Sequence, residues 1–280
     1  MKLKIGSQKF NFEPNFSPAS SNWKRRLSWY TPSPVLIGTY NCFVKRFENQ
    51  PSGWPLIKTL LNEENINIPK VLAVSEAKET GDSTWYLFHE FLKGPTLKEA
   101  LRKDIKIQYE NLIDGLWKGL EAIHKRGYWH TDFNEDNILF SLSDKQFYLI
   151  DIDSTESVKL KPRRESSKKG GVVNHELAII ALRFIEQYID KSIDSFAPFG
   201  GILLNQLQFL ALIAKLDFLR NTKDKISKKE IRTSVPKHLK QSGTIADQYL
   251  TAIWDNRNDG AILSLPILKT IVKHHFPNLH

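Results

Sequence analysis

Residues 123–153 read IHKRGYWHTDFNEDNILFSLSDKQFYLIDID, and this stretch decides the fold. Two short apolar runs, Ile138–Phe140 and Phe147–Ile150, are separated by a polar turn. Short apolar runs on either side of a turn predict a β-hairpin. Because the strands of a hairpin are antiparallel, Asn137, before the first run, would lie beside Asp151, after the second.

The polar residues of this stretch match the needs of phosphoryl transfer. A hydroxyl acceptor needs a carboxylate that orients it and accepts its proton, and Asp132 is the catalytic candidate. Nucleotide phosphates need a divalent cation, and Mg²⁺ prefers oxygen ligands, for which Asn137 and Asp151 are candidates. Asp153 could hold the metal or substrate beside Asp151, or form a turn. ATP and Mg²⁺ are therefore the expected cofactors.

The spacing His130-x-Asp132-x-x-x-x-Asn137, followed by Asp151 after an apolar run, resembles the catalytic and metal-binding loops of the protein-kinase-like superfamily. Within that superfamily, Trp129–Leu139 and Ile150–Asp153 look most like bacterial lipopolysaccharide kinases, which phosphorylate Kdo or heptose sugars of the inner core. The resemblance implies an ATP-dependent kinase. It also implies an α+β fold with two lobes, a small β-rich N-lobe and a larger, mainly helical C-lobe.

The resemblance divides the chain into an N-lobe at 1–90, a hinge at 91–94 and a C-lobe at 95–280. In this family the hinge backbone binds the adenine edge, which assigns nucleotide contacts to Glu90 and Leu92. The residue pattern predicts N-lobe strands or hairpins over Lys2–Phe12, Val35–Phe47, Pro69–Val74 and Thr84–His89, with a helix over Pro55–Leu61. It predicts C-lobe helices over Leu97–Arg102, Ile107–Arg126, Asn174–Ile189, Leu203–Arg220, Thr244–Asp255 and Ala261–His274.

Lys45 is the candidate for contacting the ATP phosphates. It lies in the run Cys42-Phe-Val-Lys-Arg-Phe47, which resembles the corresponding strand of lipopolysaccharide kinases. Alternation along a strand places Phe43, Lys45 and Phe47 on one face. Arg46 is the alternative, because a register slip of one residue exchanges the two faces.

Two features of the superfamily have no clear counterpart. A glutamate from the N-lobe helix usually pairs with the lysine, and here Glu63 and Glu64 are poorly placed candidates at the helix end. No Gly-x-Gly-x-x-Gly motif precedes Lys45. Backbone N–H groups of Gly6-Ser7 or Ser17–Ser21 are the candidates for covering the phosphates.

Two replacements argue against a regulated protein kinase. Thr131 stands where many protein kinases have an arginine that binds a phosphorylated activation loop. Asn134 stands where serine/threonine kinases have a lysine. A protein kinase, including a secreted effector, and a nucleotide-binding pseudokinase remain alternatives. A zinc site built from His124, His130 and Asp132 is a further alternative.

The chain has 280 residues and a net charge of +9, which favours anionic partners. A basic run follows the loop that contains Asp151, and its residues are Lys161, Arg163, Arg164, Lys168 and Lys169. This run would bind an anionic glycolipid acceptor at the inner-membrane surface. The alternative is that it is only a solvated loop. Aromatic residues are not interleaved with these charges, so no nucleic-acid partner is expected.

The sequence predicts a cytoplasmic protein that is peripheral on the inner face of the inner membrane. Its single cysteine allows no internal disulfide, which fits a reducing compartment. No apolar core of signal-peptide length follows Met1. The most apolar segment, residues 201–219, contains several polar residues, so no transmembrane segment is expected.

Overall fold

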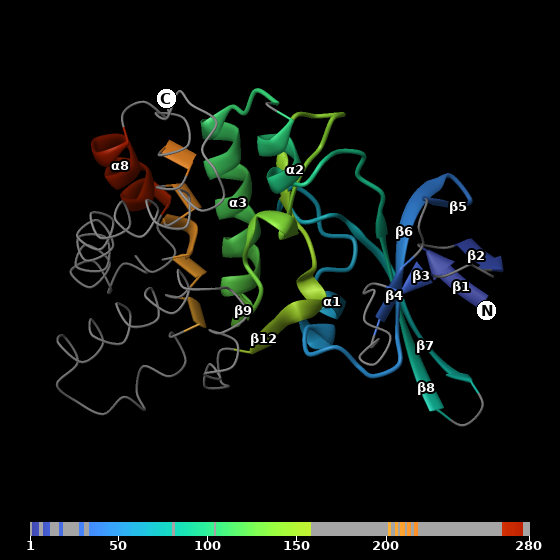
Figure 1. The fold of residues 1–280 in the computed structure, drawn as a ribbon. Coiled ribbons are helices and arrows are strands. Elements are labelled where there is room, and N and C mark those ends of the chain that lie inside the picture. Colours follow the sequence, from blue (N-terminus) through green and yellow to red (C-terminus); the bar gives the residue numbers. More distant parts are fainter. Residues whose placement is uncertain are drawn as a thin grey trace, which may run out of the picture.

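The computed structural model describes residues 2–5, 8–11, 17–18, 28–30, 34–79, 82–103, 105–157, 201–202, 205–206, 208–210, 212–213, 216–217 and 265–276. Figure 1 shows a β-sheet region on one side and a mainly helical region on the other. This arrangement confirms the predicted α+β fold with two lobes. The helices predicted over Asn174–Ile189 and Thr244–Asp255 lie outside the described residues.

The N-lobe is built on one antiparallel sheet. Its strands follow the order β3 (Ser17–Pro18), β4 (Ser28–Tyr30), β6 (Tyr40–Phe47), β8 (Asp82–Glu90) and β7 (Val71–Glu79), and β5 (Val35–Ile37) also pairs with β6. A separate hairpin joins β1 (Lys2–Ile5) to β2 (Gln8–Asn11), as the alternation over Lys2–Phe12 predicts. The helix α1 (Trp54–Thr59) lies between β6 and β7 along the chain.

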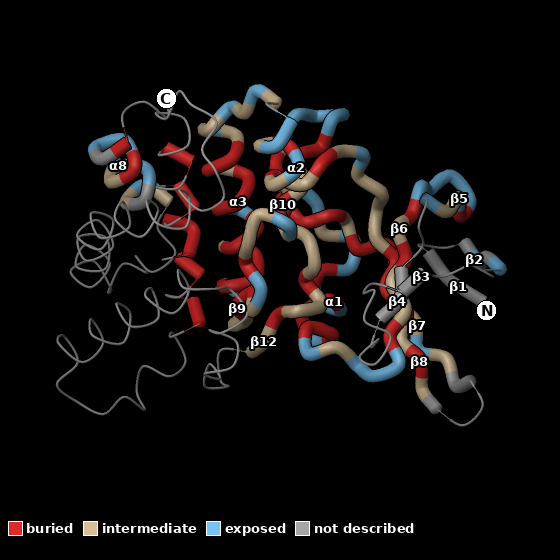
Figure 2. The backbone as a smooth tube through the Cα atoms, in the orientation of Figure 1, coloured by how far each residue is buried: buried red, intermediate tan, exposed pale blue. Residues whose placement is uncertain are grey.

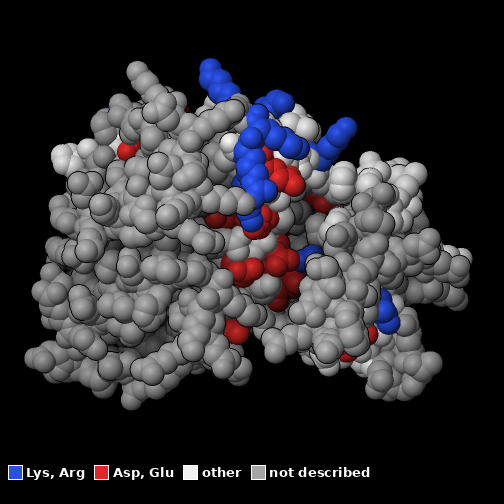
Figure 3. Space-filling model, in the orientation of Figure 1, with Lys and Arg blue, Asp and Glu red and all other residues white. Residues whose placement is uncertain are grey.

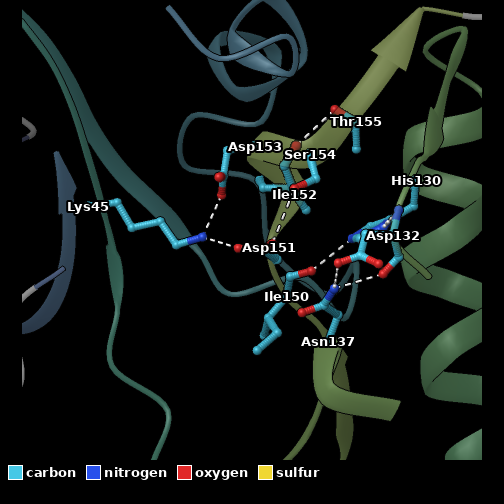
Figure 4. A network of polar contacts seen from close by, with 10 residues as sticks. All are labelled: Lys45, His130, Asp132, Asn137, Ile150, Asp151, Ile152, Asp153, Ser154 and Thr155. Atoms are coloured by element: carbon cyan, nitrogen blue, oxygen red, sulfur yellow. Dashed lines mark hydrogen bonds and ion pairs between the residues drawn. The ribbon is translucent and has the colours of Figure 1, made fainter. Parts of the chain in front are cut away.

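The register of β6 fixes the direction of the Lys45 side chain. Cys42 and Val44 are fully buried in a small core with Phe88 of β8. Successive side chains of a strand point to opposite faces, so Lys45 leaves the other face of β6. In Figure 4 its side chain extends toward the loop that carries Asp151.

The C-lobe combines helices with two small antiparallel pairs of strands. The helices are α2 (Leu97–Arg102), α3 (Tyr109–His124) and α8 (Leu265–His275), and the described parts of 201–217 are also helical. The strand pairs are β9 (Tyr128–His130) with β12 (Thr155–Ser157) and β10 (Ile138–Phe140) with β11 (Phe147–Leu149). Two 3₁₀ turns, η2 (Glu135–Asn137) and η3 (Ile152–Ser154), carry polar residues of the loops. Within the described residues, no helix has the length and apolar character needed to cross a membrane.

The helix α2 begins at a capping box. The Thr96 hydroxyl accepts from the Glu99 backbone N–H at 3.3 Å, and the Glu99 carboxylate accepts from the Thr96 N–H at 3.1 Å. Just before this helix, the linker from β8 lies against β10, where Phe140 N donates to Pro95 O at 2.9 Å. A Cβ atom on Gly94 would lie 1.8 Å from Phe140 O, so only glycine allows this approach. The segment after the predicted hinge is thereby held against the strand that follows Asn137.

The N-lobe inserts one loop into the C-lobe core. Asn67 lies in the loop between α1 and β7. Its side-chain Nδ2 donates to Phe147 O at 3.0 Å, and its backbone oxygen accepts from Leu149 N at 2.9 Å. Helix α3 packs against this contact, and Figure 2 shows buried residues along the helix. A Cβ atom on Gly115 of α3 would lie 2.6 Å from Phe147 O. The close approach of α3, β11 and the Asn67 loop therefore requires a residue without a side chain.

We expect Gly115→Ala to lower the free energy of unfolding by about 1–3 kcal/mol, the usual cost of overpacking a core. Alanine has the higher helix propensity, so a purely local effect would instead stabilise α3. Urea denaturation followed by circular dichroism measures the difference. Lys118→Ala, at an exposed position of the same helix, is the control. Equal unfolding midpoints for both variants would contradict the close approach.

Candidate active site

The loop after β9 presents the Asp132 carboxylate to solvent, held by two carboxamides. Asn134 Nδ2 donates to Asp132 Oδ1 at 2.8 Å, and Asn137 Nδ2 donates to Asp132 Oδ2 at 3.1 Å. Asn134 also accepts from the Asp136 backbone N–H at 2.8 Å, which caps η2. The turn therefore fixes the orientation of the carboxylate and leaves it exposed to an incoming hydroxyl group.

His130 has a structural position at the base of this loop. It is buried, and its Nε2–H donates to Ile150 O at 2.9 Å while Nδ1 accepts from Asp132 N at 3.3 Å. Burial lowers the pKa of His130. The neutral ring thus ties the Asp132 loop to the strand end that carries Asp151.

A buried amide that sequence analysis did not single out connects this loop to a more distant helix. Asn205 Oδ1 accepts from His130 N at 2.7 Å, and Asn205 Nδ2 donates to His130 O at 2.8 Å. His124 Nε2, at the end of α3, donates to the same Oδ1 at 3.2 Å. The alternative of a zinc site from His124, His130 and Asp132 is therefore wrong, because both Nε2 atoms are used in hydrogen bonds to the protein.

The β10–β11 hairpin brings Asn137 and Asp151 together, as the two apolar runs predict. The Ile150 N–H donates to Asn137 O at 3.0 Å. The next residue, Asp151, has φ 64° and ψ 36°, in the left-handed region. This conformation, tolerated by aspartate, turns its carboxylate out of the strand and toward the N-lobe.

Lys45 contacts this loop across the space between the lobes. Its ammonium group pairs with Asp151 and lies 2.6 Å from Asp153 Oδ1 (Figure 4). Burial favours a lower pKa for Lys45, but the charges of Asp151 and Asp153 outweigh it and raise the pKa above its ordinary value. Lys45 lowers the pKa of Asp151 to about 2, whereas burial raises that of Asp153. Of the two basic residues considered, it is Lys45 and not Arg46 that pairs with these carboxylates.

The oxygen atoms at this position fit a divalent cation. The ammonium group of Lys45 already places one positive charge beside Asp151. Asn137 uses its Nδ2 as a donor to Asp132, so its Oδ1 remains available as an acceptor. Carboxylate and amide oxygens are the ligands that Mg²⁺ prefers. Across the described ranges, three or more His, Cys, Asp and Glu side chains never gather as a metal site, so phosphate oxygens would complete the coordination.

The two glutamates considered as partners of Lys45 are engaged elsewhere. Glu63 pairs with Arg126 at 2.9 Å, and Glu64 pairs with Lys70 at 2.5 Å. Neither of these poorly placed candidates therefore contacts Lys45. The reason is the short α1, which ends at Thr59 and places both glutamates beyond its C-terminus.

The predicted hinge follows the end of β8. The Glu90 carboxylate accepts from Lys70 N at 2.8 Å, and the Glu90 backbone oxygen accepts from His89 Nδ1 at 3.0 Å. In the described part of the chain, the backbone of Leu92 has no hydrogen-bond partner and could meet a base edge. A pocket behind this edge is lined by Lys45, Ile68, Pro69, Leu87, His89, Ile150, Asp151, Ile152 and Asp153.

Acidic side chains gather around the site among the residues that the structure describes. Figure 3 shows Asp and Glu side chains gathered in the hollow between the lobes, with Lys and Arg on the rim above it. The basic run predicted to bind an acceptor, from Lys161 to Lys169, lies outside the described residues, as does Gly6-Ser7. Of the segment Ser17–Ser21, only Ser17–Pro18 is described, as strand β3.

The protein kinase domain family matches residues 48–244, more than half of the chain. The chain belongs to the protein kinase domain family. The members of this family are ATP-dependent phosphotransferases that use a divalent metal ion. The match begins three residues after Lys45, so it covers the Asp132 and Asp151 loops but not the lysine.

Three similar proteins are named as protein kinases. The probable serine/threonine-protein kinase fnkB of Dictyostelium discoideum is 32% identical over 88 residues, which are 30% of this chain and 16% of that protein. The mitogen-activated protein kinase kinase kinase MCK1 of Pyricularia oryzae is 30% identical over 106 residues, which are 36% of this chain and 6% of that protein. Serine/threonine-protein kinase D of Synechocystis is 29% identical over 96 residues, which are 34% of this chain and 18% of that protein. The chain spans less than a fifth of the length of each. These matches support the protein-kinase-like superfamily and do not distinguish the lipopolysaccharide kinases within it.

The buried histidine at the end of α3 makes the stability of this kinase domain depend on pH. Burial lowers the pKa of His124 from 6.5 to about 4. At pH values between these two pKa values, His124 binds a proton in the unfolded chain but not in the folded one. The free energy of unfolding is therefore highest above the unfolded pKa and falls as the pH is lowered toward the folded pKa. The expected loss is about 2 kcal/mol between about pH 7 and pH 5.

Urea unfolding at several pH values measures this loss. His124→Gln keeps a donor for Asn205 and removes the titrating ring, so its stability should fall less steeply than that of the wild type. His130, whose pKa is also lowered by burial, contributes in the same direction in both proteins. His274→Gln, at an exposed position of α8, is the control and should keep the wild-type slope. If the free energy of unfolding of His124→Gln fell with pH as steeply as that of the wild type, His124 would not be the source of the pH dependence.

Proposed function

We propose that this kinase domain transfers the γ-phosphoryl group of ATP to a hydroxyl group, with Asp132 as the catalytic base. Asn137 and Asp151 are proposed to hold Mg²⁺, and Lys45 to contact the phosphates. The observation that carries the proposal is the position of Asn137. The side-chain Nδ2 of Asn137 donates to the Asp132 carboxylate at 3.1 Å. The backbone oxygen of Asn137 accepts from the N–H of Ile150, the residue before Asp151. The base and the metal ligands are thus neighbours.

Each side chain has a distinct part in this proposal. Asp132 orients the acceptor hydroxyl and accepts its proton as the hydroxyl oxygen bonds to the γ-phosphorus. The bond from that phosphorus to the bridging oxygen of ADP breaks at the same time. Lys45 places positive charge on the phosphate side of the reaction, where negative charge moves onto ADP. A bound Mg²⁺ would neutralise phosphate charge.

For the acceptor we propose a Kdo or heptose sugar of the lipopolysaccharide inner core, reached from the cytoplasmic face of the inner membrane. The support is sequence resemblance at Phe43–Phe47, Trp129–Asn137 and Ile150–Asp153, together with the basic run at 159–169. Asn134, where serine/threonine kinases carry lysine, hydrogen-bonds to Asp132 and supplies no positive charge.

A serine or threonine of a protein is the second candidate acceptor. The family description and the names of all three similar proteins favour it. The acidic hollow between the lobes also suits a basic peptide better than a phosphorylated glycolipid (Figure 3).

Replacing the base should stop transfer without weakening nucleotide binding. Asp132→Ala should lower the turnover by about 10²–10⁴-fold, the usual contribution of a general base. Binding of a fluorescent ATP analogue with Mg²⁺ should stay within about twofold, because Asp132 faces the acceptor. Asp136→Ala removes another exposed carboxylate of the same loop and should keep near-wild-type turnover. Turnover of Asp132→Ala within about tenfold of wild type would remove Asp132 from this role.

The acceptor is tested with labelled ATP, Mg²⁺ and a panel of substrates. We expect transfer to a Kdo- or heptose-bearing lipid A precursor, abolished by Asp132→Ala. Protein substrates and aminoglycosides should be poor acceptors. Transfer to proteins with none to the glycolipid would replace the first acceptor with the second. ATP binding without transfer to any acceptor would instead indicate a pseudokinase.

A further inference from the structure

Lys45 has two carboxylate partners, and the proposed metal site needs only one of them. The side chains of Lys45 and Asp153 are 16% and 13% exposed, whereas that of Asp151 is 30% exposed. A charge held away from water is costly unless an opposite charge stays beside it. If Asp151 binds the metal, Lys45 still needs a permanent partner.

Asp153 is placed to be that partner. It lies in η3, and its backbone oxygen accepts from Gly53 N, at the start of α1, at 3.2 Å. A Cβ atom on Gly53 would lie 2.3 Å from Ile152 O, so η3 and the start of α1 are in close contact. The backbone of Asp153 is therefore fixed against the start of α1, the helix from which kinases of this superfamily usually supply a glutamate to the lysine.

The N-lobe offers no competing carboxylate among the described residues considered for this role. Glu63 is paired with Arg126 and Glu64 with Lys70. Figure 4 shows the Lys45 nitrogen directed at the two aspartates of the Ile150–Asp153 segment. Both partners of Lys45 thus come from the C-lobe loop.

We propose that Asp153 is a positioning residue that holds Lys45 in place for the phosphates, and that Asp151 alone of the two aspartates binds the metal. This rests on the proposed function. It replaces the sequence-based assignment of Asp153 to the metal. A cation bound to Asp151 would repel the Lys45 ammonium group, and Asp153 retains the lysine when this happens. The position of Lys45 is then set by η3 itself, without movement of a separate helix.

The test compares Asp153→Asn with Asp151→Asn. Asp153→Asn should lower kcat/KM for ATP by about tenfold to hundredfold, the value of one charge-assisted hydrogen bond. Its half-saturating Mg²⁺ concentration should stay within about twofold of wild type. Asp151→Asn should raise that concentration by more than about tenfold. Asp153→Asn keeps the Lys45–Asp151 pair, and its urea midpoint verifies folding.

A double variant separates positioning from metal binding. In a Lys45→Met background, Asp153→Asn should cause no further loss, because Asp153 acts through the lysine. Asp153→Glu restores the charge and should recover part of kcat/KM. Glu63→Gln is the matched control from the N-lobe and should leave the ATP kinetics unchanged.

Affinity for a fluorescent ATP analogue in EDTA and in Mg²⁺ tests the same point without any acceptor. Asp153→Asn should weaken binding in both conditions, and Asp151→Asn only with Mg²⁺. A tenfold rise in the Mg²⁺ requirement of Asp153→Asn, or an equal loss with and without Lys45, would overturn the inference. Failure of transfer to every acceptor, with these binding results intact, would overturn only the proposed function.

Discussion

The site depends on one constraint, the partly buried ammonium group of Lys45 beside two carboxylates. Strand β6 supplies the lysine, and the turn after β11 supplies Asp151 and Asp153. A charge in this position requires its partners to stay close, so the ion pairs fix the separation of the two lobes at the place where a nucleotide would bind. Each element on either side, from the β6 register to the left-handed Asp151, serves to keep this contact.

Carboxamides hold the rest of the site in place. Asn67 joins the N-lobe loop to β11, Asn205 joins β9 to α3, and Asn134 and Asn137 hold Asp132. A carboxamide both donates and accepts, so one side chain can satisfy a backbone N–H and a backbone C=O at once, as Asn205 does for His130. These carboxamides therefore position the backbone of the site and the Asp132 carboxylate without adding charge of their own.

The sequence predicts those features that follow from local pattern. Apolar runs gave the β10–β11 hairpin, and strand alternation placed Lys45 on the face opposite Cys42 and Val44. The sequence could not reveal contacts between distant residues, such as that of Asn205 with His130, because one polar residue among several in a helix carries no sign of its partner. The partner of Lys45 was sought in the N-lobe because of resemblance. Because α1 is short, Glu63 and Glu64 lie beyond its end and do not reach Lys45. Only the three-dimensional position of η3 identifies Asp153 as a partner of the lysine.

One structure determination tests the account most directly: the protein crystallised with a non-hydrolysable ATP analogue and Mn²⁺, with the ion located by its anomalous scattering. The account predicts Mn²⁺ on Asn137 Oδ1 and the Asp151 carboxylate, Lys45 on the phosphates and still paired with Asp153, and Asp132 facing open solvent beside the γ-phosphate. An ion bound by Asp153 instead of Asp151, or a nucleotide bound away from Lys45, would contradict it.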